Sequence, residues 1–348
     1  MTQATIESPQ VLAGLQLNGD GLVDVGAMRP FIHNGRAYVS INVNGERKSV
    51  AVPHVNALLQ KDEWIAYDAA VRRVATIRLN AVNDLRNNGL VWNAGDLGST
   101  IAEWDAASDM TDADVNMSGV AKAEKDSQAF GLNGVPIPVI RKDFQINKRR
   151  LLASRRMGQG VDATGAETAT RLVAERSESI LFNGFSITTG GYTLYGYTNH
   201  PDRGTVTISD WSLPATTGKT IVEETLELIS ASEAKKHYGP FMLYVGPNFW
   251  SKLKEDYSDN KGDNTIYDRL RALSQIMDVK VSDQLADDNV VLVQMTSDVI
   301  DLAVAQDVMS VQWESGDTMQ ANYAVMAAWA PRIKPDFNGE VGIIHGTV

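Results

Sequence analysis

Alternating apolar and polar residues predict a small β-meander near the start of the chain. Three short runs, residues 31–33, 36–43 and 46–52, are joined by Asn34-Gly35 and Asn44-Gly45. Asn-Gly is a favoured two-residue hairpin turn because both central positions require positive φ. We therefore predict a three-stranded meander over about residues 29–53. A ribbon of this size needs a packing partner, which is either the main domain of its own chain or a neighbouring chain.

Helical periodicity marks two long segments, 61–87 and 164–183. The first is followed by the stop residue Gly89 and carries Arg72, Arg73 and Arg78 among its apolar positions. These arginines form either a solvated basic face or the lining of an interior that holds nucleic acid. The second segment ends at Asn183-Gly184, a typical helix stop. Its apolar stripe is expected to include Ala169, Leu172, Val173, Arg176, Ile180 and Leu181.

Residues 98–134 lack strong periodicity and are rich in Gly, Ser, Asp and Ala. A connection of this length is unusual inside a compact domain. It is therefore either a mobile loop or an excursion that packs on another chain. Trp104, Met117 and Phe130 are apolar anchors that suit the second interpretation.

The next stretch combines a strand pattern with the most basic part of the chain. Alternating Val135, Ile137 and Val139 predict a strand, which the two prolines restrict to a sheet edge or an entry. Residues 147–157 are predicted to be helical. Four arginines of this piece are candidates for an interior surface or an interface: Arg149, Arg150, Arg155 and Arg156. A solvated surface or a salt-bridge site is the alternative.

The last ~130 residues, about the length of one domain, are predicted to form a unit of mixed helices and strands, followed by a series of strands. Helices are expected from Thr216 or Thr217 to about His237, over 247–253 and over 266–276. Strands are expected at 241–245, 278–281 and 290–294, and then at 300–304, 309–313, 322–330 and 340–345. The polar stretch 254–264 predicts an exposed loop that contains Asp256, Asp259 and Lys261. In residues 322–330, strict alternation predicts one well-buried face.

Composition adds a size and several exclusions. The 348 residues are 43% hydrophobic and 22% charged, which is typical of globular proteins. No apolar stretch approaches the ~20 residues of a membrane span, and no secretory signal is visible. The formal charge of −11 argues against a general nucleic-acid binder, because phosphate contacts need clustered Lys and Arg. An inner face that is locally less acidic could still enclose DNA.

Candidate chemistry is sparse. The chain has no cysteine, which excludes disulfides, thiolate nucleophiles and cysteine metal sites. The five histidines show no i, i+3 or i, i+4 pair, so each is expected to be a surface or turn residue: His33, His54, His200, His237 and His345. Residues 216–220 superficially resemble a phosphate loop, but Leu213 occupies the position of the first required glycine. We therefore predict no catalytic residue, no metal site and no cofactor, and a structural protein rather than an enzyme.

The series of segments resembles tailed-phage major capsid proteins and the related encapsulin shell proteins. No single motif is diagnostic, and the collinear order from about Lys61 to the C-terminus carries the resemblance. The matching stretches are PVIRKDFQI (138–146), the basic piece with its glycine break, SILFNG (179–184), YGY (195–197), GPFMLYV (239–245) and PNFWSKL (247–253).

The resemblance implies an α+β fold of the Hong Kong 97 type. Residues 1–89 would form the N-terminal arm and 90–134 the E-loop region, which reaches over a neighbouring subunit. Residues 135–217 and 305–348 would build the P-domain around a spine helix at about 164–183. Residues 218–304 would form the A-domain, whose loop with Asp256, Asp259 and Lys261 would lie near a symmetry axis.

The resemblance also implies function and partners. The chain would self-assemble through pentamers and hexamers into the icosahedral head of a tailed phage, in the cytoplasm of the host bacterium. Portal and scaffolding proteins would be partners, with a decoration protein as a further one, and packaged double-stranded DNA would be held by weak non-specific contact. Lys122 and Lys125 lie in the loop that some relatives crosslink, with Asn338 as a conceivable partner, but no catalytic Glu can be assigned. The alternatives are an encapsulin-like compartment that holds a cargo enzyme and a soluble α+β enzyme.

Overall fold

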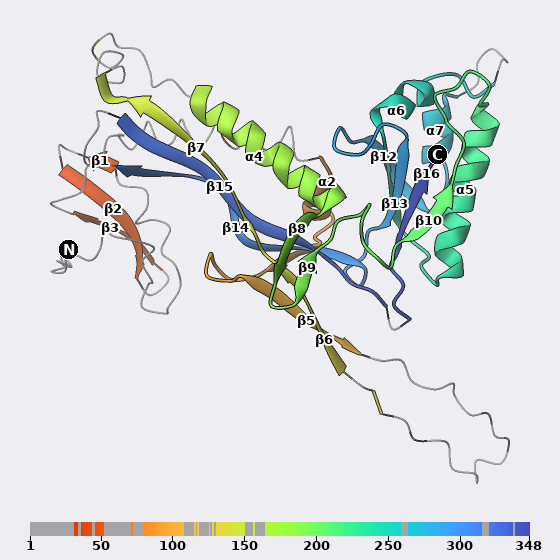
Figure 1. The fold of residues 1–348 in the computed structure, drawn as a ribbon, viewed down its shortest axis with the longest axis horizontal. Helices are drawn as coiled ribbons and strands as arrows, with labels where there is room; N and C mark the ends of the chain where they lie inside the picture. The colour runs from red at the N-terminus through yellow and green to blue at the C-terminus, as the bar shows by residue number, and fades with distance from the viewer. Residues whose placement is uncertain are drawn as a thin grey trace.

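The computed structural model describes residues 31–33, 36–43, 46–51, 71, 80–107, 115, 117, 125, 127–128, 130–149, 156, 164–258, 264–314, 320–336 and 338–348. It combines helices with separate, mostly antiparallel sheets (Figure 1), in agreement with the α+β prediction. The helices are α2 (Asn80–Asn87), α4 (Thr164–Asn183), α5 (Gly218–Ala234), α6 (Pro247–Leu253) and α7 (Ile266–Arg271). Within these described residues, no helix is long and apolar enough to cross a membrane.

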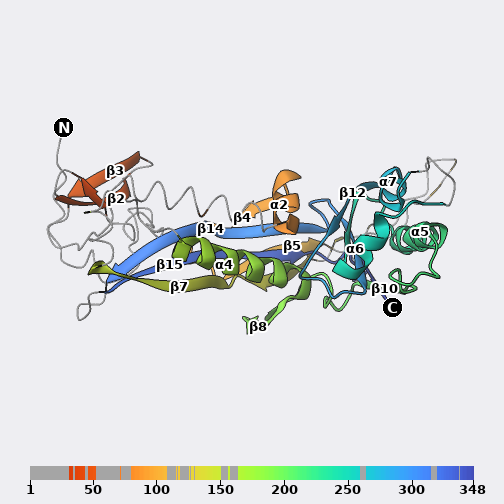
Figure 2. The same cartoon turned by 90° about the horizontal axis from the view of Figure 1, so that it is seen from above.

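A long four-stranded sheet forms the body of the molecule. Its strand order is β4 (Val91–Asn93), β14 (Ile300–Glu314), β15 (Gln320–Ile333) and β7 (Val139–Asn147). The predicted strands 300–304 and 309–313 are one continuous strand, β14, whose register with β15 shifts between Val304 and Met309. The helix α4 lies along this ribbon (Figure 2) and packs on β7 and β15.

Both faces of β15 are buried, whereas the sequence predicted one. Tyr323 stacks on Phe144 of β7, with ring centroids 5.5 Å apart, on the side that joins the main core. On the alternate face, Ala324 and Met326 form a small separate cluster with Leu97. The strand β15 lies between β14 and β7, and both faces of the sheet are covered at this point. The middle of β15 therefore has apolar residues on both faces, instead of an apolar face opposite a polar one.

The helix α4 spans the residues predicted for it, Thr164–Asn183. Its buried stripe includes Ala169, Val173, Ile180 and Leu181, but Leu172 and Arg176 are exposed, so these two were wrongly placed in the stripe. The helix ends at Gly184, whose φ of +65° favours glycine. A Cβ at Gly184 would also lie 2.7 Å from the Leu194 carbonyl oxygen.

A second core surrounds a five-stranded sheet with the order β10 (Gly204–Thr207), β16 (Ile343–Thr347), β13 (Asn289–Gln294), β11 (Phe241–Val245) and β12 (Ile276–Val281). The helices α5, α6 and α7 pack against it. Of the two predicted starts, Thr216 and Thr217, it is Thr217 that caps α5, by accepting from the Thr220 N–H. The helix α7 ends at Arg271, five residues before the predicted end. The strands β10 and β16 lie in segments that were expected to belong to the P-domain. In the structure they are part of this five-stranded sheet, in which β16 pairs with β10 on one side and with β13 on the other.

Two hairpins leave the main body. The strands β5 (Ile101–Ala107) and β6 (Phe130–Pro136) form one, largely within the region 98–134, where the sequence shows no strong periodicity. The strands β8 (Phe185–Thr189) and β9 (Tyr192–Leu194) form the other. The predicted single strand over Val135 to Val139 is in fact split, because β6 and β7 belong to different sheets and meet at Ile137-Pro138.

The predicted meander is present. The strands β1 (Phe31–His33), β2 (Arg36–Val43) and β3 (Glu46–Ala51) form an antiparallel sheet in which Phe31 lies opposite Tyr38. The predicted helix 61–87 is described only at Val71 and over α2, where it ends at the expected residue. The rest of that prediction, with Arg72, Arg73 and Arg78, lies outside the described residues.

Candidate functional site

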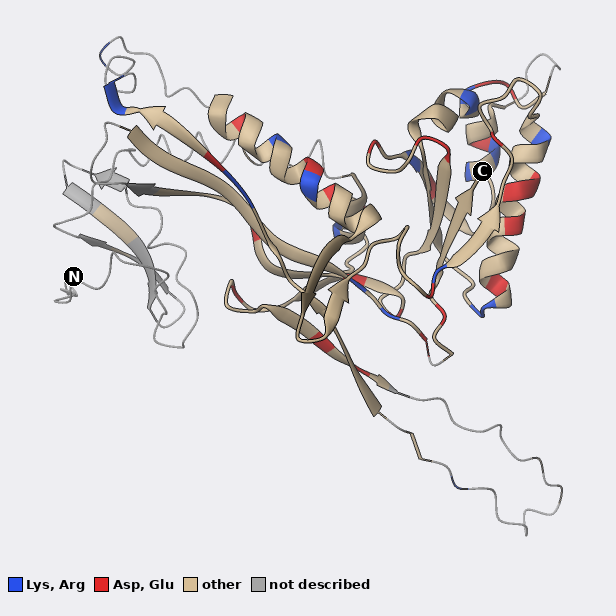
Figure 3. Cartoon of the chain, viewed as in Figure 1, with Lys and Arg blue, Asp and Glu red and all other residues tan. Residues whose placement is uncertain are grey.

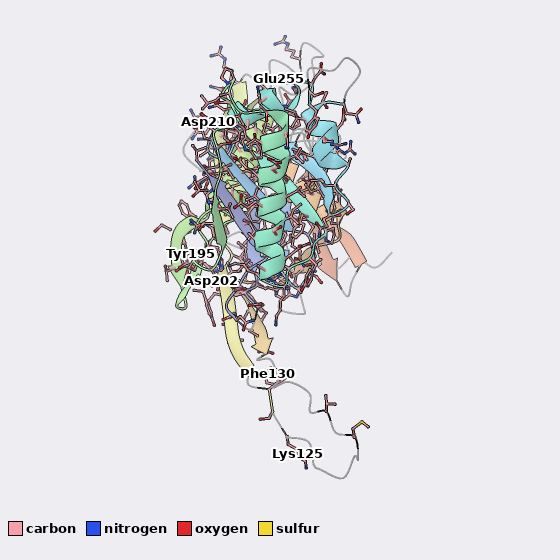
Figure 4. The ribbon with its side chains drawn as sticks, turned by 90° about the vertical axis from the view of Figure 1, so that its right-hand side faces the viewer. Lys125, Phe130, Tyr195, Asp202, Asp210 and Glu255 are labelled. Carbon is pink, nitrogen blue, oxygen red and sulfur yellow. The ribbon has the colours of Figure 1, made fainter. Side chains whose placement is uncertain are left out.

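The hairpin β5–β6 projects away from the rest of the molecule (Figure 1), and Phe130 and Lys125 lie far from the body in Figure 4. Its ladder runs from Ile101 opposite Pro136 to Ala107 opposite Phe130. Phe130 is 70% exposed and Leu132 is 55% exposed, while Met117 farther out is fully exposed. The far end of the hairpin is therefore an apolar, solvent-exposed projection of the described chain.

Trp104 differs from the other two predicted anchors. It is half-buried and packs against the main core of its own chain. The sequence did not predict this internal packing, which arises because Trp104 lies on the inward side of β5 near the base of the hairpin. The contact of Met117 and Phe130 with a neighbouring chain stays a prediction.

A buried ionic group lies under this base, and we name it the hairpin-base cluster: Asp301, Arg332, Lys334, Trp92 and Trp104. Arg332 donates from Nε and Nη2 to the two carboxylate oxygens of Asp301, each at 2.6 Å. Lys334 Nζ donates to Asp301 Oδ2 at 2.7 Å and to the Ser297 carbonyl oxygen at 2.7 Å. The Arg332 guanidinium lies 4.1 Å from the Trp92 ring centroid and 5.7 Å from that of Trp104.

The other side of the hairpin base rests on β9. A Cβ at Gly134 would lie 2.7 Å from the Tyr192 ring, so the ring packs where glycine leaves room. A hollow of about 230 Å³ opens here, lined by Trp104, Tyr192, Tyr195, His200, Pro331 and Pro335 among others. Tyr195 and Asp202 lie at this level of the molecule in Figure 4.

A second buried group joins the N-terminal helix α2 to both cores, and we name it the α2 junction: Asp84, Glu178, Tyr244 and Lys280. Glu178 of α4 accepts from the backbone N–H groups of Ala81 at 2.7 Å and Val82 at 3.4 Å. It therefore occupies the N-terminus of α2, where the helix dipole favours negative charge. One turn later, Asp84 accepts from Lys280 and, at 3.0 Å, from the Tyr244 hydroxyl.

Burial dominates the electrostatics of the α2 junction. Desolvation raises the pKa of Glu178 to about 7, against a lowering by its two backbone donors. Burial also raises the pKa of Tyr197 and of Tyr244. The rings of Phe182, Tyr197 and Tyr244 form an edge-on and stacked cluster with centroids 5.2 to 6.2 Å apart.

Three histidines are buried: His200, His237 and His345. The prediction of a surface residue is therefore wrong for all three, and His345 does not lie in a turn either, since it is part of β16. Burial and the neighbouring Arg203 lower its pKa to about 4, so it is neutral at physiological pH. Across the described ranges, no three His, Asp or Glu residues are grouped to hold a metal ion.

The predicted charged residues are partly described. Arg149 and Arg156 are exposed, while Arg150 and Arg155 lie outside the described residues. Asp256 is exposed and forms an isolated bridge with Thr265, and Asp259 and Lys261 are outside the description. Lys125 and Asn338 are exposed, and Lys122 is not described. Acidic residues gather on α5, while β7 and α4 carry residues of both signs (Figure 3).

The sequence reasoning missed both buried ionic groups. A signal existed for one: Asp301 and Arg332 each interrupt an apolar strand pattern near its end. Their pairing could not be inferred without the antiparallel register of β14 and β15, which places them directly opposite each other.

Comparisons with known proteins agree with this architecture. The curated relative "Type 1 encapsulin shell protein EncA" of Myxococcus xanthus (strain DK1622) is 25% identical over 291 residues, which are 81% of this chain and 93% of the relative. The solved capsid of Myoviridae phage XM1 has a TM-score of 0.59 at 11% identity and covers 76% of this chain and 91% of its own. The virus-like particle from Pyrococcus furiosus has a TM-score of 0.56 at 17% identity, with 81% and 98% covered.

These similarities confirm the predicted α+β fold of the Hong Kong 97 type, shared by phage capsid proteins and encapsulins. The expectation of a structural protein rather than an enzyme agrees with relatives that are named as shell and capsid proteins. A sequence profile described as a family of unknown function, DUF6260, matches residues 54–346. The chain therefore belongs to the DUF6260 family and has the Hong Kong 97-type fold.

Proposed function

We propose that this chain assembles with copies of itself into a closed shell. The observation that carries the proposal is the hairpin β5–β6, which presents Phe130 and Leu132 to solvent. Large apolar side chains exposed on a two-stranded projection are expected to pack on a second surface. A head-to-tail contact of this kind, repeated around an axis, closes into rings.

The proposed shell is the head of a tailed phage, which encloses double-stranded DNA and is assembled in the host cytoplasm. The structural similarity to the phage XM1 capsid supports this choice. The meander β1–β3 supports it as well, since the resemblance implies that encapsulins lack this N-terminal addition. Portal and scaffolding proteins, and a decoration protein, are the partners that this role would require.

A second candidate is an encapsulin-like compartment around a cargo enzyme. The 25% identity with an encapsulin shell protein favours it, because the match covers 93% of that relative. The two candidates share the shell and differ in its size and content.

Size-exclusion chromatography with light scattering, followed by negative-stain microscopy, tests the shell. We expect pentamers, hexamers or closed particles of the 37.9 kDa chain. Replacement of both Phe130 and Leu132 by Ser should abolish assembly while leaving the circular dichroism spectrum unchanged. Leu213→Ser is the matched control, since Leu213 is 50% exposed but lies outside the hairpin.

Each outcome has a defined meaning. A wild-type chain that stays monomeric at every concentration and with added scaffold would overturn the proposal. Particles that form equally well without Phe130 and Leu132 would remove the hairpin from it. Small uniform particles that co-purify with a protein cargo would favour the encapsulin-like candidate over the phage head.

A further inference from the structure

The orientation of the hairpin β5–β6 relative to the body is not fixed by a larger sheet. The two strands of the hairpin pair only with each other in the described part of the chain. Its base is anchored in the main core through Ala102 and Val135, and β6 contacts β9, β8 and β15. Beyond these residues, Trp104 rests on the hairpin-base cluster. The side chains next to the anchored base, Trp104 among them, therefore set the angle at which the hairpin leaves the body.

Arg332 is placed to set that angle. Its guanidinium plane is fixed by two parallel hydrogen bonds to Asp301, each 2.6 Å long. Arg332 and Asp301 are both over 90% buried and belong to the two longest strands of the main sheet. A bidentate pair leaves the guanidinium little rotational freedom, and Lys334 holds Asp301 from a third direction.

The guanidinium contacts the hairpin through Trp104. It stands 5.7 Å from the centroid of this ring on β5 and 4.1 Å from the ring of Trp92 on β4. Arginine stacks favourably on aromatic faces, more strongly when the pair is removed from water. Since Trp92 belongs to the main sheet and Trp104 to the hairpin, one buried cation connects the two.

We infer that Arg332 is a positioning residue that fixes the direction of the β5–β6 hairpin by holding Trp104 against the main sheet. The importance of this direction rests on the proposed shell function, because a hairpin must point at the same place on every neighbour for a ring to close. The positioning itself is a property of the single chain and can be measured without assembly.

The measurement is a distance between two spin labels in one chain. The chain has no cysteine, so Phe130→Cys on the hairpin and Leu172→Cys on α4 provide two labelling sites without further changes. Both side chains are exposed. Labelled chains are diluted into unlabelled chains so that each distance comes from one molecule. We expect a single narrow distance distribution in the otherwise unchanged chain.

Four variants test the inference against this background. Trp104→Leu removes the ring and keeps an apolar side chain, and should replace the narrow peak with a broad distribution. Trp104→Phe retains a ring and should restore the narrow peak. Trp92→Leu is the matched control, because it removes a ring from the same guanidinium without touching the hairpin, and should leave the peak narrow. Arg332→Lys keeps the charge, loses the planar fork and should broaden the peak.

Gly134→Ala gives an independent readout from the opposite side of the base. A Cβ there would lie 2.7 Å from the Tyr192 ring, so the ring must move away from the hairpin. We expect the peak to keep its position and its width, because Arg332 still holds Trp104.

The results that overturn the inference are equally specific. One is an unchanged narrow peak in Trp104→Leu and Arg332→Lys, even if both variants melt earlier. Another is equal broadening in Trp92→Leu and Trp104→Leu, which would assign Arg332 a purely structural role. A wild-type chain that never assembles but shows the expected peaks would refute the shell and leave the positioning role intact.

Discussion

The two buried ionic groups of this chain balance their charges in opposite ways. In the hairpin-base cluster, the cations Arg332 and Lys334 face the single carboxylate of Asp301. In the α2 junction, the carboxylates of Asp84 and Glu178 face the single ammonium of Lys280. The first group therefore has one cation in excess, and its Lys334 side chain is partly exposed to solvent. The second group has one carboxylate in excess, and its Glu178 is almost fully buried.

The difference shows how a buried charge is accommodated when no counter-ion remains for it. Asp301 is neutralised by salt bridges, whereas Glu178 is held by backbone N–H groups at a helix N-terminus. Backbone donors compensate less of the lost hydration than a bidentate guanidinium does. The pKa of Glu178 is accordingly raised to about 7. The hairpin-base cluster is thus held by direct salt bridges, whereas the raised pKa of Glu178 makes the α2 junction depend on pH.

The largest effect is expected from removing the charge of Asp301. Asp301→Asn leaves Arg332 without a buried counter-ion, which is expected to lower the free energy of unfolding by about 3–5 kcal/mol. Urea denaturation of unassembled chains measures it. Asp298→Asn is the control, because Asp298 lies nearby but is exposed. Losses of the same size in both variants would show that burial of the pair is not the cause.

The fold was largely predictable because its strongest signals are local. The Thr164–Asn183 helix, the Thr217 cap, β11 and the meander follow from periodicity and turn residues over short windows. The pairing of β10 with β16, about 140 residues apart, has no such local signal. The order of segments along the chain implied where the domains begin and end. It could not show which sheet β10 and β16 join, because that depends on pairing between distant strands.

The candidate site was less predictable for a related reason. Phe130 and Met117 stand out as large apolar residues within a polar segment, and exposure of both agrees with the hypothesis. Trp104 carries the same signal but packs inward, because side chains alternate along β5 and its base lies on the core. Arg332 and Glu178 each gain their role from partners 31 and 97 residues away, and sequence spacing does not reveal such partners.

The pH dependence of the α2 junction should be next in size. The folded pKa of Glu178, about 7, exceeds its ordinary value of 4.5, so the folded chain binds this proton more tightly than the unfolded chain. Its stabilising contribution is complete below pH 4.5 and is lost as the pH rises through 7, by about 3 kcal/mol. Unfolding free energies between pH 5 and 8 measure the loss.

A neutral isostere isolates this carboxyl. Glu178→Gln should remove most of that slope and make the chain more stable than the wild type at pH 8, since an amide oxygen can still accept from Ala81. Glu175→Gln on the same helix is the control, because Glu175 is partly exposed and pairs with Arg171. An unchanged slope in Glu178→Gln would contradict the assignment.

A smaller loss is expected when Lys280 is replaced. Lys280→Met removes the cation of the α2 junction and leaves Asp84, among the described residues, with the Tyr244 hydroxyl as its side-chain donor. Because the Lys280 side chain is 34% exposed, solvent screens part of this interaction, and we expect a loss of about 2 kcal/mol. Lys280 also lowers the pKa of Glu178, so the variant should extend the loss of stability to higher pH. A double-mutant cycle with Asp84→Asn checks that the two residues act as a pair.

The smallest change in the free energy of unfolding should come from breaking an arginine–aspartate pair at the surface. Arg141 donates from Nε and Nη2 to the two carboxylate oxygens of Asp143, at 2.5 and 3.0 Å, which is the fork geometry of Arg332 and Asp301. Both side chains are about half exposed, so water already solvates the charges that the pair brings together. Asp143→Asn should therefore change the free energy of unfolding by less than about 1 kcal/mol, and salt should reduce the change further. If this variant lost as much stability as Asp301→Asn, then fork geometry rather than burial would determine the strength of such pairs, and the contrast drawn between the two buried groups would lose its basis.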